Sequence, residues 1–144
     1  MSRSGYSDEY CDDNWQLIKW RGQVASAIRG KRGQAFLREL VEALDAMSEK
    51  RLIAHELQEG GNVCAIGSVG LKRGVDMSRL DPDDPETIAG AFGIAHQLVR
   101  EIEFENDELN WGDATPERRW HHMRNWAASH LSATPSPSSQ DSQS

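Results

Sequence analysis

The stretch that decides the fold is residues 85–107, which read P-E-T-I-A-G-A-F-G-I-A-H-Q-L-V-R-E-I-E-F-E-N-D. Apolar residues recur in it three or four positions apart, as on one face of a helix, and they are Ile88, Ala89, Phe92, Ile94, Leu98, Val99 and Ile102. Gly93 interrupts this series at a point that suits a sharp turn. The spacing therefore predicts two short helices joined at one glycine.

Outward from this pair, residues 34–47 carry the strongest amphipathic pattern in the chain. Its apolar face is broad and consists of Phe36, Leu37, Leu40, Val41, Leu44 and Met47. An earlier helix is predicted to end near Arg29, with an apolar stripe of Trp15, Ile18, Gly22, Ala25 and Ile28. Only R-G-K-R-G, residues 29–33, links the two helices, so they are expected to pack as antiparallel neighbours. A last helix is predicted over residues 116–131, after an N-cap at Thr115.

Residues 51–65 are predicted to form a β-hairpin, because two apolar arms flank the turn E-G-G at residues 59–61. The first arm, R-L-I-A-H-E-L, is also compatible with a helix. A short helix is predicted over residues 66–74 despite Gly67 and Gly70. Each glycine costs about 1 kcal/mol in a helix interior, so this helix must be held by tertiary packing.

Together these patterns predict a mainly α protein with a small β-hairpin, folded as a compact single-domain helical bundle. A polar N-terminal arm is expected at residues 1–12, the helical domain at 13–131 and a disordered Ser/Pro/Gln-rich tail at 132–144. The residues predicted to be buried together are Phe36, Leu40, Leu44, Phe92, Val99 and Ile102.

Length and composition support one soluble domain, since the chain has 144 residues of which 38% are hydrophobic. No apolar run approaches the roughly 18 residues that span a bilayer, and the polar start lacks a signal peptide. A cytoplasmic protein without membrane contact is therefore expected. Cys11 and Cys64 are far apart in the sequence and are expected to be thiols in a reducing compartment.

The net charge of −7 is unevenly distributed. Residues 15–38 contain six bases and no acid, whereas residues 81–113 contain ten acids and a single base, Arg100. The two regions face each other in the fold, or are simply solvated, or one of them is a docking surface. The sequence leaves these possibilities open.

The leading candidate for a docking surface is the basic link with Arg29, Lys31 and Arg32, extended by Trp20 and Arg21. Exposed cations there would contact an acidic protein, a phosphate or a nucleic-acid backbone, and an exposed tryptophan would serve as an interface anchor. The simpler interpretation is a solvated loop. The leading hypothesis is thus a non-enzymatic protein that binds a macromolecule, above all a protein, in an oligomeric state that the sequence does not define.

The alternative is a DNA-binding regulator that uses residues 85–107 as a helix-turn-helix. A small residue, a turn glycine four positions later and aliphatics in the second helix suit that motif, and here they are Ala89, Gly93, Ile94, Val99 and Ile102. In this interpretation His96, Gln97 and Arg100 would lie toward the DNA groove. The acids that follow would repel phosphates.

A second alternative is a small enzyme whose site is assembled only in three dimensions, for example from Glu56, Glu101 and Glu105. No nucleophile elbow and no H-E-x-x-H pattern is present. The histidines at 121, 122 and 130 do not have the spacing of a zinc module, so neither a metal nor a cofactor is expected.

Several motifs are similar to those of small acidic proteins from bacteriophages and prophages. They are G-Y-S near the start, W-R-G at 20–22, A-I-R-G-K-R-G-Q-A-F-L-R-E at 27–39, G-I-A at 93–95, E-x4-N-D at 101–107 and T-P-E-R-R-W at 115–120. The chain resembles this group over about residues 3–131. The resemblance implies expression in the cytoplasm of an infected bacterial cell and a role in host takeover, defence evasion or regulation. It also implies that the bound macromolecule, most of all a protein, belongs to the host or the phage.

Overall fold

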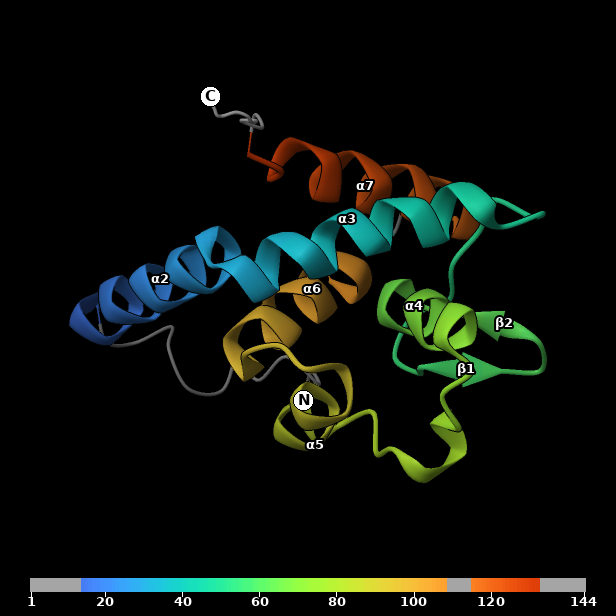
Figure 1. The fold of residues 1–144 in the computed structure, drawn as a ribbon, viewed down its shortest axis with the longest axis horizontal. Coiled ribbons are helices and arrows are strands. Elements are labelled where there is room, and N and C mark those ends of the chain that lie inside the picture. Colours follow the sequence, from blue (N-terminus) through green and yellow to red (C-terminus); the bar gives the residue numbers. More distant parts are fainter. Residues whose placement is uncertain (1–13, 109–114, 133–144) are drawn as a thin grey trace.

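The computed structural model describes residues 14–108 and 115–132. The predicted arm at 1–12 and almost all of the predicted tail lie outside these residues. The described part is mainly helical with one small antiparallel hairpin (Figure 1), which confirms the predicted fold class. The elements in order are α2 (Asn14–Arg29), α3 (Lys31–Ala46), β1 (Gln58–Glu59), β2 (Asn62–Val63), α4 (Ala65–Arg73), a 3-10 turn (Met77–Arg79), α5 (Pro85–Phe92), α6 (His96–Asp107) and α7 (Pro116–Ser129). None of the described helices is long and apolar enough to span a bilayer.

Helix α6 lies at the centre of the molecule and packs against α2, α4, α5 and α7. Its residues are all buried or partly buried. Helix α3 packs against α4 and α7 (Figure 1). The six residues that the sequence predicts to be buried together all belong to one core, which confirms that prediction.

The turn between α5 and α6 forms as predicted. The Asp84 side chain caps α5 by accepting a hydrogen bond from the Thr87 N–H at 3.2 Å, and Pro85 occupies the first turn. Gly93 adopts a left-handed conformation with φ of 73° and donates its N–H to the Ala89 carbonyl at 2.8 Å. A glycine accommodates this conformation without the steric cost that a side chain would add.

Helices α2 and α3 follow each other end to end instead of folding back (Figure 1), so the predicted antiparallel packing is wrong. Helix α3 begins at Lys31, which leaves Gly30 as the whole link. Antiparallel helix pairs usually need a loop of about two to five residues. The joint is close-packed, because a Cβ on Gly33 would lie 1.9 Å from the Ala27 carbonyl oxygen.

A buried glutamine holds this joint against the far end of the chain. The Gln34 Nε2 donates hydrogen bonds to the Ile28 carbonyl at 2.8 Å and to the His130 carbonyl at 2.9 Å. Its Oε1 accepts a hydrogen bond from the Ser132 N–H at 2.8 Å. The amide therefore links the end of α2, the start of α3 and the end of α7.

The hairpin is shorter than predicted, with two residues in each strand and Glu59 paired with Asn62. The predicted first arm, residues 51–57, has no regular strand or helix, although Ile53 still donates its N–H to the Val63 carbonyl at 2.9 Å. The glycines of α4 follow from close packing. A Cβ on Gly67 would lie 2.0 Å from the Leu57 carbonyl oxygen, so no larger residue fits there without movement.

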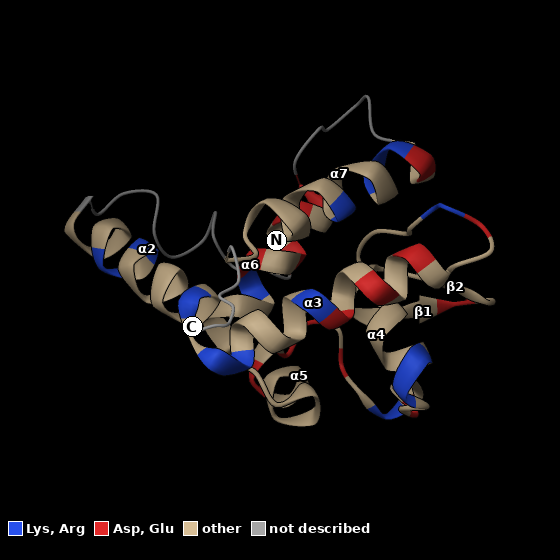
Figure 2. Ribbon diagram, turned by 45° about the horizontal axis from the view of Figure 1, so that its top comes forward, with Lys and Arg blue, Asp and Glu red and all other residues tan. Residues whose placement is uncertain are grey.

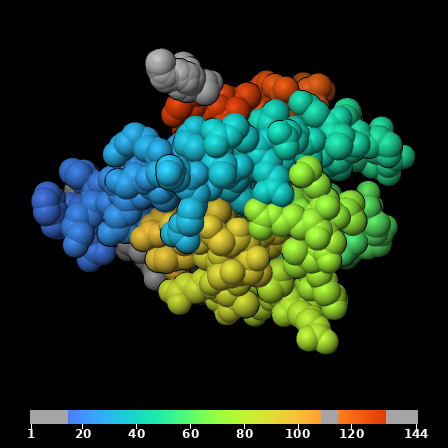
Figure 3. All heavy atoms as spheres, viewed as in Figure 1, coloured from blue at the N-terminus to red at the C-terminus, as the bar shows by residue number. Residues whose placement is uncertain are grey.

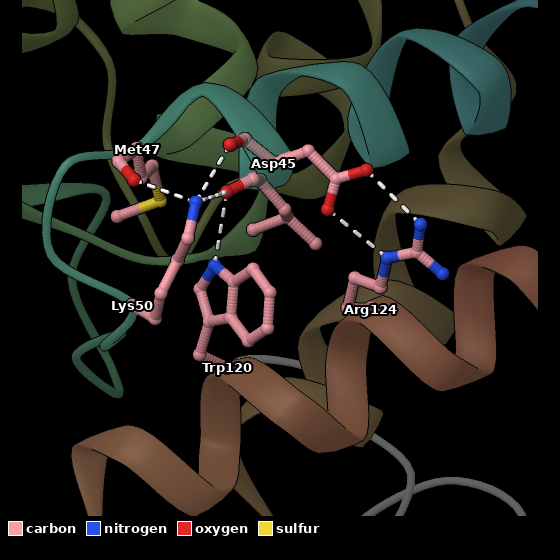
Figure 4. A network of polar contacts seen from close by, with 6 residues as sticks. Asp45, Met47, Lys50, Trp120 and Arg124 are labelled. Atoms are coloured by element: carbon pink, nitrogen blue, oxygen red, sulfur yellow. Dashed lines mark hydrogen bonds and ion pairs between the residues drawn. The ribbon is translucent and has the colours of Figure 1, made fainter.

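Helix α7 is fixed to the end of α3 by polar contacts (Figure 4). The Trp120 indole donates a hydrogen bond to the Leu44 carbonyl at 3.2 Å, and Lys50 donates to the Asp45 carbonyl at 2.6 Å. Arg124 forms two hydrogen bonds to the Asp45 carboxylate, at 3.0 and 3.1 Å. The hydrogen bonds from Trp120 and Lys50 reach carbonyls at the end of α3, where a helix leaves its last carbonyls without intrahelical partners.

A second polar centre joins α6 to α4 and α7. The buried Asn106 side chain accepts a hydrogen bond from the Ala65 N–H at 3.1 Å and donates to the Ile53 carbonyl at 3.0 Å. Arg119 donates to the Asn106 carbonyl at 2.8 Å and to the Leu52 carbonyl at 3.0 Å. The irregular segment before β1 is thereby held in place.

Candidate partner-binding surface

The inner side of α2 is buried against α6 through Trp20, Val24 and Ile28. Trp20 is only 6% exposed, so the prediction that it anchors a partner is wrong. Its ring lies 6.1 Å from the His96 ring, centroid to centroid, and the Arg100 guanidinium lies 5.5 Å from its centroid. These contacts to α6 explain why Trp20 faces inward.

The opposite side of α2 is exposed, and we call it the outer face. Trp15 is 68% exposed and Ile18 is 56% exposed. Gly22, Ser26 and Arg29 continue this side at intervals of three or four residues and are exposed as well. The predicted apolar stripe of α2 is therefore divided, since its first part faces solvent and only Ile28 joins the core. Large exposed apolar side chains that are clustered mark interaction sites more often than scattered ones do.

A groove of about 550 Å³ runs along one edge of the outer face, between α2 and the start of α6. Its lining includes Lys19, Gly22, Gln23 and Ser26 from α2, and Ala95 and Gln97 from the start of α6. Most of these side chains are small or uncharged, and Lys19 contributes the one formal charge among them. The groove thus leaves room for another segment to approach α2 closely, beside the charged side chain of Lys19.

The basic link next to the outer face is exposed at Arg29, Lys31 and Arg32, as is Arg21 on α2. Within the described residues none of these four side chains forms an ion pair. Arg32 makes one long hydrogen bond, 3.5 Å, to the Gly93 carbonyl. Figure 2 shows the lysines and arginines of α2 and of the start of α3 without an acid among them. Figure 3 shows the first half of α2 projecting beyond the body of the molecule.

Acids elsewhere in the fold have partners of their own. Glu39 pairs with Arg73 at 2.6 Å, and this hydrogen bond lowers the pKa of the Glu39 carboxyl. Glu105 contacts His122 at 2.7 Å between α6 and α7. Burial raises the pKa of Glu105, because the loss of hydration outweighs the hydrogen bond from His122. The described pairs therefore do not neutralise the basic link from within the molecule.

The three residues of the helix-turn-helix alternative, His96, Gln97 and Arg100, lie together beside α2. The Gln97 amide reaches the Gln23 side chain at 3.4 Å, while the other two residues contact Trp20. A recognition helix needs a free face that enters the major groove, and no residue of α6 is fully exposed. DNA binding by this stretch stays a prediction, but the packing of α6 weighs against it.

The residues named for an enzymatic site are distributed over two places. Glu101 and Glu105 lie one helical turn apart on α6 and interact electrostatically, whereas Glu56 is exposed in the segment before β1. In the described parts of the chain, no group of three or more His, Cys, Asp or Glu side chains is arranged to hold a metal ion. No catalytic arrangement is assigned to these residues.

Sequence reasoning missed the exposure of Trp15 and Ile18, which it assigned to an apolar stripe together with Ile28. The available signal was a second set, Trp20 and Val24 with Ile28, spaced four residues apart on the other side of the helix. Two such stripes on one helix predict that one is buried and the other exposed.

Comparison of the chain with protein-family models, with curated proteins and with solved structures finds no match.

Proposed function

We propose that this protein is a non-enzymatic binding module that docks an acidic protein partner on the outer face of α2 and the adjoining basic link. The observation that carries the proposal is the exposure of Trp15 and Ile18 on a projecting helix. Apolar anchors beside cations provide both affinity and electrostatic steering in protein interfaces. The resemblance to phage and prophage proteins supports a setting in the infected bacterial cell, with host takeover, defence evasion or regulation as the biological role.

The charge distribution favours a protein over a nucleic acid. The whole chain carries −7 and residues 15–38 carry +6, so the remaining residues carry −13. A polyanion longer than α2 would meet this acidic remainder and lose the gain from counterion release. An acidic site on a protein can be confined to the basic region.

The test compares two aspartate variants at matched positions. Ile18 on α2 and Leu71 on α4 are each 56% exposed, so Ile18→Asp and Leu71→Asp add the same charge at equal exposure. Tagged wild-type and variant proteins are used to recover partners from a nuclease-treated bacterial lysate, with quantification by mass spectrometry. Ile18→Asp should lower recovery of the partner about ten-fold or more, whereas Leu71→Asp should leave it unchanged.

Mobility-shift assays at two salt concentrations test the DNA alternative with the same proteins. The proposal is overturned if all three proteins recover the same set from the lysate. It is also overturned if the wild type shifts duplex DNA and Ile18→Asp does not, because the outer face would then serve nucleic acid.

A further inference from the structure

We infer that the partner segment on the outer face is an acidic amphipathic α-helix that lies alongside α2. This inference rests on the proposed function and specifies the kind of segment that the surface fits. It follows from the dimensions of the surface, from the order of its chemical groups along the helix, and from the groove at its edge.

The outer face has the length of a short helix. Trp15 and Arg29 are separated by fourteen residues of α2, which corresponds to about 21 Å along the axis, or about four turns. Space above the middle of this face is open, because a Cβ on Gly22 would meet no atom within 4 Å. Packed helices approach to about 8–10 Å between axes, and small side chains at the crossing favour the shorter distance.

The chemical groups change in order along this length. Trp15 and Ile18 make the first turn apolar, Lys19 adds a cation beside the groove, and Arg29 and Lys31 make the far end basic. A helix that matches this order has apolar residues at one end of its contact face and Asp or Glu in the turns beyond. Such segments bind through residues at i, i+3, i+4 and i+7.

The groove supplies the remaining contacts. Ser26 and Gln23 line it from α2, and Ala95 and Gln97 line it from the start of α6. Apart from Lys19, the lining side chains are small or uncharged, so the edge of a second helix can enter without burying a further charge, which would be costly.

Selection from a randomised library of 18-residue peptides on the immobilised full-length chain tests the inference, with Ile18→Asp protein as the counter-selection. The enriched peptides should carry apolar residues at helical spacing and several Asp or Glu residues. An enriched peptide, labelled and measured by fluorescence anisotropy, should bind the wild type and Leu71→Asp equally. It should bind Ile18→Asp at least about ten-fold more weakly, and its circular dichroism should show helix formation on binding.

Enriched peptides without helical spacing, or with basic residues in place of acids, would overturn the inference. So would a duplex DNA that competes for the same site more strongly than the best peptide at equal salt. A dimer in sedimentation velocity that Ile18→Asp dissociates would show that a second copy of the chain occupies the face. If the peptides fail while Ile18→Asp still loses the lysate partner, the helical inference falls and the proposed function stands.

Discussion

The sharpest test of the fold is the substitution Gly33→Ala at the joint between α2 and α3. A Cβ at this position would lie 1.9 Å from the Ala27 carbonyl oxygen and 3.0 Å from its carbon. Ordinary contacts between carbon and a carbonyl oxygen are about 3.3 Å or longer. The backbone at the joint must therefore move by more than about 1 Å to accept one methyl group.

The net effect follows from two opposing contributions. Alanine is a better helix former than glycine by about 1 kcal/mol, which favours the variant in the first turn of α3. Overpacking a close-packed site costs about 1–3 kcal/mol, and the cost lies at the upper end here because backbone atoms, not a flexible side chain, must yield. Gly33→Ala should thus destabilise the protein by about 2 kcal/mol.

Gly30→Ala is the matched control, three residues away in the same joint. A Cβ there would lie 3.4 Å from the Ser26 carbonyl oxygen, an ordinary contact, and Gly30 has a φ of −67° that alanine adopts freely. Gly30 is the N-cap of α3, a position where alanine is less favourable than glycine, so this variant should cost no more than about 1 kcal/mol. Urea denaturation followed by circular dichroism at 222 nm measures both variants. Equal stability of Gly33→Ala and Gly30→Ala would refute the argument that close approach at Gly33 sets the angle between α2 and α3.

Three further outcomes are expected. Leu40→Ala should cost about 2–5 kcal/mol in the free energy of unfolding, because Leu40 is fully buried in the core; a loss below about 1 kcal/mol would contradict its central place. Glu39→Gln should cost about 1 kcal/mol at neutral pH, where the paired carboxylate is ionised. Because Arg73 lowers the pKa of Glu39 below its ordinary 4.5, that difference should persist down to about this pH and disappear as the pH falls through the lowered pKa. For Glu105 the change of stability with pH has the opposite sign, since burial raises the pKa of its carboxyl despite the hydrogen bond from His122. The wild type should lose stability relative to Glu105→Gln as the pH rises from about 4.5 through the raised pKa, and denaturation curves with no such pH-dependent difference would oppose this reasoning.

The parts of the fold that could be predicted from the sequence depend on local chemistry. Helical spacing, Gly93 at the turn and Pro85 after its cap located α5 and α6, and the broad apolar face of α3 located the core. The direction of α2 relative to α3 could not be predicted in this way. It depends on the close approach of Gly33 to a carbonyl six residues earlier, and a glycine in a basic link gives no sign of such packing.

Buried polar residues within helices, which hold the fold together, were also not predicted from the sequence. Gln34 and Asn106 lie within helices where a polar side chain is expected to face solvent, yet both are buried and hydrogen-bonded to distant backbone. Gln34 reaches a carbonyl 96 residues away and Asn106 reaches an N–H 41 residues away, so no local window contains these two interactions. For the candidate site, the burial of Trp20 could not be predicted for a similar reason, because its contacts come from α6.

The motifs on which the expected resemblance to phage and prophage proteins rests include residues that hold the fold, but they leave out the apolar end of the outer face. Several of their residues hold the fold, namely Gln34 at the joint of α2 and α3, Asn106 in the network around α4, and Arg119 in α7. The basic link lies within these motifs as well, whereas Trp15 and Ile18 lie outside them. A chain with the same motifs would be expected to share the architecture and the basic link. The apolar end of the outer face lies outside the motifs and is free to differ. Under the proposed function, the motifs would therefore preserve the scaffold and its cations, and the choice of partner would be tested by substitutions at Trp15 and Ile18.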